Sequence, residues 1–276
     1  MLRSNLHTHT LWCDGKNTPR EMVERAIDLG FDTLGFSGHS YTSFDTSFCL
    51  RDPQGYTEEI LALQKEYEGR IKVLLGVERD ALGECTFDPA YAIGAVHYVT
   101  ARGMHYPIDH NLAWQKRLIE EGYHGDVMSA VAAYFHSLPE MAYRIKPDFV
   151  AHMDVFAKFN EQHPAFDETG DEYLTLAFEA VEGIMEHCRV FEVNTGGMFR
   201  GYRSAPYPTL PILKHIQKCG GEVTISSDAH KIEALNYGFR EALGVISRAG
   251  FDTLRVMTPA GWVKMPIEEA LLGYEL

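Results

Sequence analysis

The chain has 276 residues, 45% of them hydrophobic, which is enough to bury the core of one large α/β domain or two small ones. Its formal charge of -14 argues against nucleic acid or an anionic membrane as the main partner, because phosphate groups are bound by Lys and Arg. No apolar run approaches the ~18 residues of a transmembrane helix.

The cysteines point to a reducing compartment. Their number is odd, no C-x-x-C pair occurs, and the first predicted strand begins too early to leave room for a signal peptide. We therefore expect a cytoplasmic protein with five free thiols: Cys13, Cys49, Cys85, Cys188 and Cys219.

Strand and helix patterns alternate along the first half. A strand over 5–9 precedes a helix that starts at Thr18-Pro19-Arg20-Glu21, with Thr as N-cap, Pro at the first position and Glu three residues after the cap, and that ends at Gly30. The further expected elements are a strand over 33–37, a loop over 40–56, a helix over 57–67, a strand over 72–77, an apolar run over 92–99 and a loop over 100–123.

The second half repeats the alternation. Helices are expected over 126–143, 171–187, 208–219 and 233–249, and strands over 149–152, 190–194, 222–226 and, more briefly, 253–256. Seven strong strand signals separated by helices or loops are typical of parallel βαβ units. No linker or internal repeat divides the chain, so a single domain over 1–276 is expected.

Potential metal ligands follow nearly every predicted strand. In a strand alternate residues share a side, so His7 and His9 can face one point. The full set of candidates is His7, His9, Asp14, His39, Glu78, His97, His152, Asp228 and His230. Imidazole and carboxylate ligands suit Zn, Mn or Fe, and nine ligands at three or four for each ion fit two or three ions.

Taken singly, these residues have ordinary explanations. His97 and His152 are typical of hydrogen-bonded core histidines, Asp14-Gly15 of a turn, and Asp228 of a helix cap. Their joint placement at strand ends favours metal binding. It also favours an α/β barrel of about seven strands over an open doubly wound sheet, because only a closed ring brings all those ends together.

Several segments carry a family resemblance. They are Leu-His-Thr-His-Thr (6–10) with Asp14, Ser-Gly-His (37–39), Gly-Val-Glu (76–78), Ala-Val-His-Tyr-Val (95–99), Asp-Phe-Val-Ala-His-Met-Asp (148–154), Phe-Glu-Val-Asn-Thr-Gly-Gly (191–197) and Ser-Ser-Asp-Ala-His (226–230). With these motifs nearly the whole chain resembles the PHP (polymerase and histidinol phosphatase) family, and most of all its monofunctional L-histidinol-phosphate phosphatase branch.

The resemblance implies a distorted (β/α)7 TIM-like barrel holding three divalent metal ions (Zn, Mn or Fe). By this resemblance His7, His9, Glu78 and Asp228 would hold the first ion, and Glu78 would share the second with His97 and His152. Asp14, His39 and His230 would hold the third. Gly38 stands where many relatives have Asp, so one carboxylate behind the ligands is expected to be missing.

Three basic residues are candidates for binding phosphate. Arg200 and Arg203 lie in a Gly-rich loop after strand 190–194, and Lys158 follows strand 149–152, at a position where relatives often carry Arg. Glu78, Asp228, Arg200 and Lys158 are the predicted catalytic residues, with Arg200, Lys158 and Arg203 contacting substrate. Asp154 or a bound water is a candidate proton donor, and His105 and His110 are weaker candidates to overhang the site.

The implied activity is metal-dependent hydrolysis of L-histidinol phosphate to L-histidinol and phosphate, in histidine biosynthesis. One alternative is a related phosphoesterase acting on another small phosphomonoester or phosphodiester. A second is a non-catalytic metal-binding module or a proofreading-type domain of a polymerase, against which the acidic charge and the absence of a basic stripe argue. The sequence makes no prediction of the oligomeric state.

Overall fold

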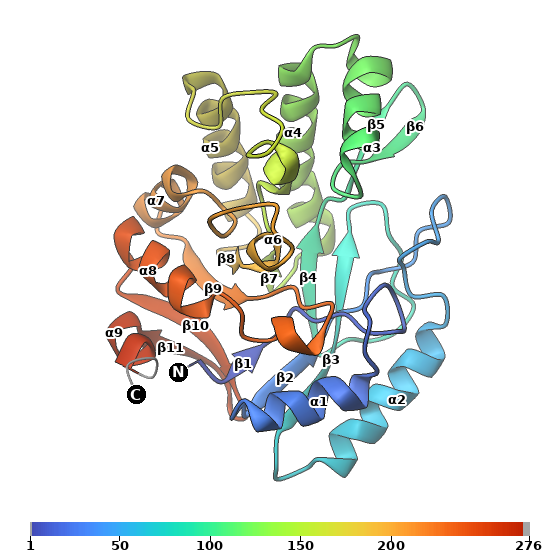
Figure 1. Cartoon of the computed structure of the whole chain (residues 1–276), viewed down its shortest axis with the longest axis vertical. Coiled ribbons are helices and arrows are strands. Elements are labelled where there is room, and N and C mark those ends of the chain that lie inside the picture. Colours follow the sequence, from blue (N-terminus) through green and yellow to red (C-terminus); the bar gives the residue numbers. More distant parts are fainter. Residues whose placement is uncertain (1, 273–276) are drawn as a thin grey trace.

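A seven-stranded parallel sheet curls into a nearly closed barrel in the computed structural model, which describes residues 2–272 (Figure 1). Its strands, in the order in which they lie side by side, are β1 (Ser4–Asn5), β2 (Thr33–Phe36), β3 (Lys72–Asp80), β4 (Tyr91–Ala95), β7 (Phe149–Val150), β8 (Val190–Asn194) and β9 (Glu222–Ser226). They correspond to the seven strands expected from the sequence, and the predicted distorted α/β barrel is confirmed. The strand expected over 5–9 is shorter than predicted, because β1 ends at Asn5 and His7 and His9 follow it.

The ring is drawn together beyond the ends of β1 and β9. Thr8 and Ala229 form an isolated parallel bridge. The N–H of His9 donates to the carbonyl of Ala229 at 2.8 Å, and the N–H of Ala229 donates to the carbonyl of His7 at 3.1 Å. The two ligand-bearing segments at opposite ends of the sheet order are thereby held next to each other.

Most helices cover the outside of the barrel, whereas the short α6 lies at its mouth (Figure 1). The helices of the described residues are α1 (Pro19–Asp28), α2 (Pro53–Glu66), α3 (Leu112–Arg117), α4 (Val127–Ile145), α5 (Asp171–Met185), α6 (Gly196–Phe199), α7 (Leu210–Lys218), α8 (Phe239–Ala249) and α9 (Ile267–Leu272). The capping box predicted for α1 is present, with Thr18 accepting from the N–H of Glu21 and Glu21 accepting from the N–H of Thr18. None of the helices among residues 2–272 has the length and apolar character needed to cross a membrane.

Three expectations about elements were wrong. The helix expected over 57–67 begins at Pro53, because Asp52 caps the N–H of Gly55 at 2.9 Å and Pro53 takes the first helical position. The loop expected over 100–123 contains the hairpin β5 (Tyr98–Ala101)–β6 (Met104–Pro107), α3 and a π-helical turn over Leu118–Gly122. The helix expected over 233–249 begins only at Phe239, after a 3-10 turn over Ile232–Ala234.

The short strand expected near 253–256 belongs to a hairpin outside the barrel. β10 (Thr253–Thr258) pairs antiparallel with β11 (Gly261–Pro266), which the sequence analysis missed. β11 alternates poorly and is largely half-exposed, so its apolar pattern is weak.

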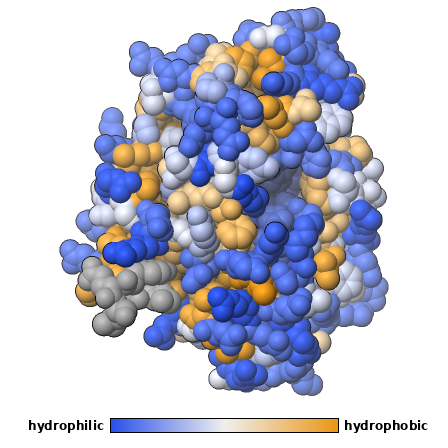
Figure 2. All heavy atoms as spheres, viewed as in Figure 1, coloured by the Kyte–Doolittle hydropathy of each residue, from blue (hydrophilic) through white to orange (hydrophobic). Residues whose placement is uncertain are grey.

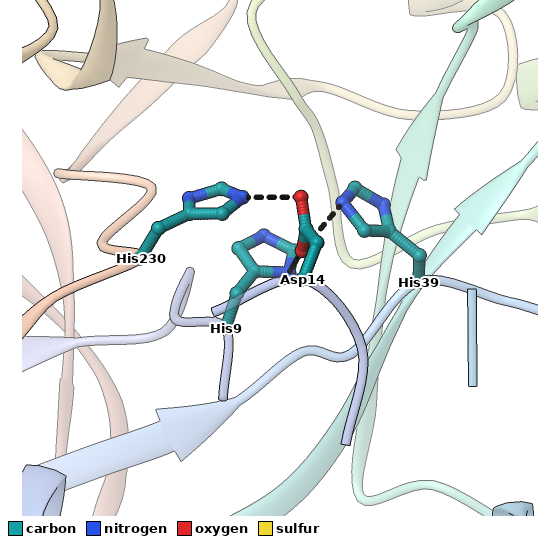
Figure 3. A group of neighbouring side chains, drawn as sticks. All are labelled: His9, Asp14, His39 and His230. Carbon is teal, nitrogen blue, oxygen red and sulfur yellow. Dashed lines mark hydrogen bonds and ion pairs between the residues drawn. The ribbon is translucent and has the colours of Figure 1, made fainter. Parts of the chain in front are cut away.

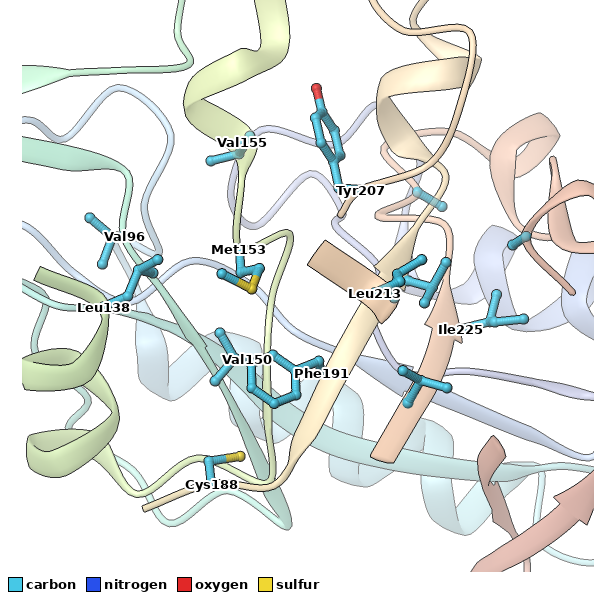
Figure 4. Packing of buried hydrophobic residues seen from close by; sticks show 14 of the residues in the cluster. Val96, Leu138, Val150, Met153, Val155, Cys188, Phe191, Tyr207, Leu213 and Ile225 are labelled. Atoms are coloured by element: carbon cyan, nitrogen blue, oxygen red, sulfur yellow. The ribbon is translucent and has the colours of Figure 1, made fainter. Parts of the chain in front are cut away.

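The core lies between the sheet and the helices that cover it. Val150 of β7 and Phe191 of β8 pack with Met153, while Leu213 of α7 lies near Ile225 of β9 (Figure 4). All of these side chains are buried. This apolar packing fixes the strand ends from which the polar site residues project.

Candidate metal centre

The structure brings all nine predicted ligands to one mouth of the barrel. Their donor atoms form four overlapping groups, each with atoms within 4.8 Å of one another. The groups are His9, Asp14, His39 and His230; His7, His9 and Glu78; His7, His152 and Asp228; and His39, Glu78 and His97. The segments that carry them follow β1, β2, β4, β7 and β9 or, for Glu78, lie within β3.

Glu78 lies at the centre of this cluster and faces it with both oxygens. Its Oε2 lies 3.1 Å from Nε2 of His7 and 3.0 Å from Nδ1 of His39. Its Oε1 lies 3.1 Å from Nε2 of His152 and 3.3 Å from Nε2 of His97. A carboxylate with a different set of imidazoles on each oxygen has the arrangement of a ligand shared between two ions.

Asp14 is surrounded by three imidazoles (Figure 3). Its Oδ2 lies 3.0 Å from Nε2 of His230, and its Oδ1 lies 3.6 Å from Nε2 of His39 and 3.8 Å from Nδ1 of His9. The His9 ring stacks against both other rings at centroid distances of 4.3 Å. His9 therefore adjoins this group as well as Glu78, whereas the resemblance implied a place with the first ion only.

Several buried polar atoms of the cluster lack a hydrogen-bond partner. They are Nε2 of His7, Nε2 of His9, Oδ1 of Asp14 and Oε2 of Glu78. An unsatisfied buried polar atom is costly, and almost all such atoms in folded proteins are paired. Nitrogen and oxygen donors that converge without partners fit divalent cations such as Zn, Mn or Fe.

The protonation of the carboxyl groups also fits cation binding. Although burial opposes ionisation, neighbouring charges hold the pKa of Glu78, Asp14 and Asp228 below their usual ranges. The opposing charges are mainly those of His7 and His39 for Glu78, of His230 and His39 for Asp14, and of Arg200 and His7 for Asp228. Burial lowers the pKa of His9 to about 3, so its imidazole is neutral and able to coordinate at neutral pH.

Two carboxylates behind the ligands were missed by the sequence analysis. Glu192 of β8 accepts from Nδ1 of His7 at 2.6 Å and from the N–H of His152 at 2.8 Å. Asp80, two residues after Glu78, accepts from the N–H of His97 at 2.7 Å and lies 3.3 Å from its Nδ1. The signal for Glu192 was a charged residue inside an apolar strand. These groups supply outer carboxylates despite Gly38.

Asp228 adopts an unusual backbone conformation. Its φ of 49° lies in the left-handed region, which is uncommon for a residue other than glycine and is often found at functional sites. Its Oδ1 lies 3.3 Å from Nε2 of His9, and its Oδ2 accepts from Nη2 of Arg200 at 2.8 Å. Asp228 thus connects the imidazole cluster to a guanidinium.

A cleft of about 690 Å³ opens over the cluster, and Figure 2 shows a hollow with hydrophilic atoms on this face. Predicted Lys158 and Arg200 both line it, as does His110, whereas His105 does not. Its other lining residues outside the ligand set include Lys16, Phe48, Asp109, Phe199, Tyr202 and Lys231. Lys16 and Lys231 were not predicted as site residues, although Lys16 lies two residues after Asp14 and Lys231 directly follows His230.

The candidate substrate-binding residue Arg203 and the candidate proton donor Asp154 also lie outside the cleft lining. Arg203 pairs with Glu168, and its side chain is only 8% exposed, so the geometry does not support its expected contact with substrate. Asp154 is fully buried and accepts from the N–H of Thr209 at 2.9 Å, which places it away from a leaving group in the cleft.

The comparisons with known proteins agree with this geometry. The PHP domain matches residues 5–195. A probable histidinol-phosphatase of Deinococcus radiodurans is 27% identical over 90% of this chain and 94% of its own length, and a histidinol-phosphatase of Bacillus subtilis is 24% identical over 88% and 99%.

A solved structure shares the fold. It is a histidinol phosphate phosphatase from Lactococcus lactis complexed with zinc, L-histidinol and phosphate, with a TM-score of 0.71, 21% identity and coverage of 95% of this chain and 99% of that one. The PHP domain match covers well over half of the chain and includes seven of the nine clustered residues, all except Asp228 and His230. The chain therefore belongs to the PHP family.

Proposed function

We propose that this protein is a metal-dependent phosphomonoesterase that hydrolyses L-histidinol phosphate to L-histidinol and phosphate. The observation that carries the proposal is the convergence of nine nitrogen and oxygen donors beneath a cleft whose wall holds Lys158 and Arg200. Relatives over nearly the full length of the chain bear the name of this activity.

The nine donors fit three divalent ions, and zinc is our first choice because the Lactococcus lactis protein is complexed with it. We assign His7, His9, Glu78 and Asp228 to one ion, His97 and His152 with Glu78 to a second, and Asp14, His39 and His230 to a third. When bound, such ions supply Lewis acidity and lower the pKa of water. Their charge would exceed that of the three carboxylates and make the cleft locally positive in a chain of charge -14.

Lys158 and Arg200 complete the phosphate site in this proposal. The Lys158 ammonium donates to the carbonyl of Asp109 at 2.5 Å and lies 3.2 Å from its Oδ2, so it is held at the cleft wall. Arg200 is held by Asp228 through Nη2 at 2.8 Å. Both cations are positioned to bind non-bridging oxygens of a phosphate and to stabilise the charge that develops there.

We place the leaving group beside Phe48, Asp109 and His110, which also line the cleft. The rings of Phe48 and His110 stack with their centroids 6.3 Å apart, and they come from the segments 40–56 and 100–123. Despite burial, the Lys158 charge helps to lower the pKa of Asp109 to about 2, so this lining carboxylate is ionised. An aromatic and an anionic wall suit the imidazole and ammonium groups of histidinol.

A substrate panel tests the proposal. The metal-loaded protein is incubated with L-histidinol phosphate, p-nitrophenyl phosphate, a sugar phosphate, a nucleoside monophosphate and bis-p-nitrophenyl phosphate, and kcat/KM is compared. We expect L-histidinol phosphate to exceed every other compound by at least about 100-fold, roughly 3 kcal/mol of discrimination. Preference for a diester or for another monoester would assign the same centre to the alternative phosphoesterase.

A further inference from the structure

The two cleft cations come from neighbouring loops. Lys158 lies in the 3-10 helix Val155–Phe159, which follows β7, and Arg200 ends the short helix α6, which follows β8. A site that binds one phosphate with both groups needs these loops in a fixed relation, because misplacing a binding group by ~1 Å can cost about 100-fold in rate.

Arg203 belongs to the loop after β8, which also carries Arg200, and its side chain binds the loop after β7. Its Nη1 donates to the carbonyl of Ala157 at 2.9 Å, next to Lys158 in sequence. Its Nη1 and Nη2 also donate to the two oxygens of Glu168 at 2.7 and 2.6 Å. A bidentate pair of this kind fixes orientation as well as distance.

Glu168 is itself held in place by the loop after β7. Nδ2 of Asn160 donates to Oε1 of Glu168 at 2.9 Å. The carbonyl oxygen Oδ1 of the same Asn160 side chain accepts from the N–H groups of Ala165 and Phe166 at 2.7 and 3.2 Å. The carboxylate that receives Arg203 is therefore part of an ordered, partly buried network.

Further contacts join the same two loops. Nε2 of Gln162 donates to the carbonyl of Gly201 at 2.5 Å, and the N–H of Ser204 donates to Glu161 at 2.9 Å. The Tyr202 ring, which lines the cleft, lies 5.2 Å from the Lys158 ammonium. Among these contacts only that of Arg203 and Glu168 is a bidentate ion pair, and its guanidinium is largely buried.

We propose that the Arg203–Glu168 ion pair fixes the relative positions of Lys158 and Arg200, so that both cations can bind the same phosphate group. The inference rests on the proposed function for its substrate. Arg203 does not touch the substrate; it acts through the two cations that do. Because Lys lacks the planar guanidinium, Arg203→Lys keeps the positive charge but cannot form the bidentate pair with Glu168 that fixes the two loops.

The first test is Arg203→Lys in the metal-loaded protein. We expect the Kd for inorganic phosphate, measured by calorimetry, and the KM for L-histidinol phosphate to rise about tenfold, with metal content unchanged. We also expect kcat to fall, because the same two cations stabilise the charge that develops on the phosphate. The matched control is Arg20→Lys, since Arg20 makes an exposed bidentate pair of the same kind with Glu66 at 2.6 and 2.7 Å on the outer helices. The control variant should bind phosphate as the wild type does.

A second variant separates positioning from stability. Replacing a buried ion pair by apolar residues of similar size often preserves or raises stability, so Arg203→Met combined with Glu168→Met is expected to stay folded with bound metal. Its phosphate affinity should still fall about tenfold or more. Wild-type phosphate affinity in this folded double variant would overturn the proposal. A wild-type protein that binds phosphate but does not hydrolyse L-histidinol phosphate would instead refute the proposed function alone.

Discussion

Glu192 accepts a hydrogen bond from Nδ1 of His7 at 2.6 Å, within the barrel and away from solvent. This contact fixes the orientation of the imidazole and directs its Nε2 toward Oε2 of Glu78, 3.1 Å away. A histidine whose second nitrogen is bound by a carboxylate is the usual arrangement behind a metal ligand. A buried carboxylate of β8 therefore orients a candidate metal ligand at the mouth of the barrel.

Glu192→Gln tests this relationship. The amide keeps the shape of the side chain but removes the charge that orients and polarises His7, so metal affinity or kcat should fall by about 10- to 100-fold. The measurement is zinc retained after dialysis against a graded chelator, together with phosphate release. Glu66→Gln is the control, because Glu66 is an exposed helix residue that pairs with Arg20 on the outer surface and belongs to none of the groups of potential metal ligands among residues 2–272. Equal zinc retention in Glu192→Gln and the wild type would remove Glu192 from this role.

Gly196→Ala probes the contact between Asp228 and Arg200. A Cβ at position 196 would lie 2.8 Å from Nη2 of Arg200 and 3.0 Å from Oδ2 of Asp228, so the pair must shift. We expect KM to rise about tenfold, because Arg200 leaves its phosphate-binding position. Gly244→Ala is the control: the nearest atom to its Cβ is Nη1 of Arg248 at 3.5 Å, which is ordinary contact. An unchanged KM in Gly196→Ala would contradict the role given to Arg200.

The buried carboxyl of Asp154 predicts a pH-dependent loss of stability. Burial raises its pKa from 3.8 to about 6, so the folded protein favours the protonated form. The stability this group contributes is present below pH 3.8 and is lost as the pH rises through 6. Asp154→Asn should therefore gain up to about 3 kcal/mol on the wild type between pH 4 and pH 7.5. Urea unfolding of both proteins at the two pH values measures the difference, and a constant difference would contradict the assignment.

Metal uptake should strengthen as the pH rises. Although burial opposes protonation, nearby carboxylates hold the pKa of His7, His97 and His230 above the usual value for histidine. The carboxylates are Glu192 and Glu78 for His7, Glu78 and Asp80 for His97, and Asp14 for His230. A cation must displace these protons, so the affinity is lower on the acid side of the raised pKa values. Zinc titration of the chelated protein at pH 6 and pH 8 checks this. A Kd that is equal or lower at pH 6 would contradict it.

Much of the site was predictable because its ligands are local in sequence and follow strand patterns. His39 and His97 follow β2 and β4, strands whose apolar character is evident, and parallel strands bring their ends together. The helix start at Thr18 was predictable for the same reason, since a capping box needs only four neighbouring residues.

The rest depended on tertiary contacts. Arg203 and Glu168 are 35 residues apart, and no local pattern indicates that one neutralises the other, so Arg203 was predicted to bind substrate like Arg200. Glu192 has no distinguishing pattern in the sequence, and its role depends on a contact with His7, which lies 185 residues away in the chain. The hairpin of β5 and β6 was missed because its strands span only four residues each.

The central claim is tested most directly by measuring phosphate release from L-histidinol phosphate. The protein is first stripped of metal with a chelator and is assayed before and after zinc, manganese or iron is added back. The account predicts negligible turnover in the stripped protein, recovery on adding at least one of these ions, and no recovery in His9→Ala or Asp228→Ala proteins that remain folded. Full turnover without metal, or substantial turnover in either folded variant, would contradict the assignment of the nine clustered side chains to a catalytic metal centre.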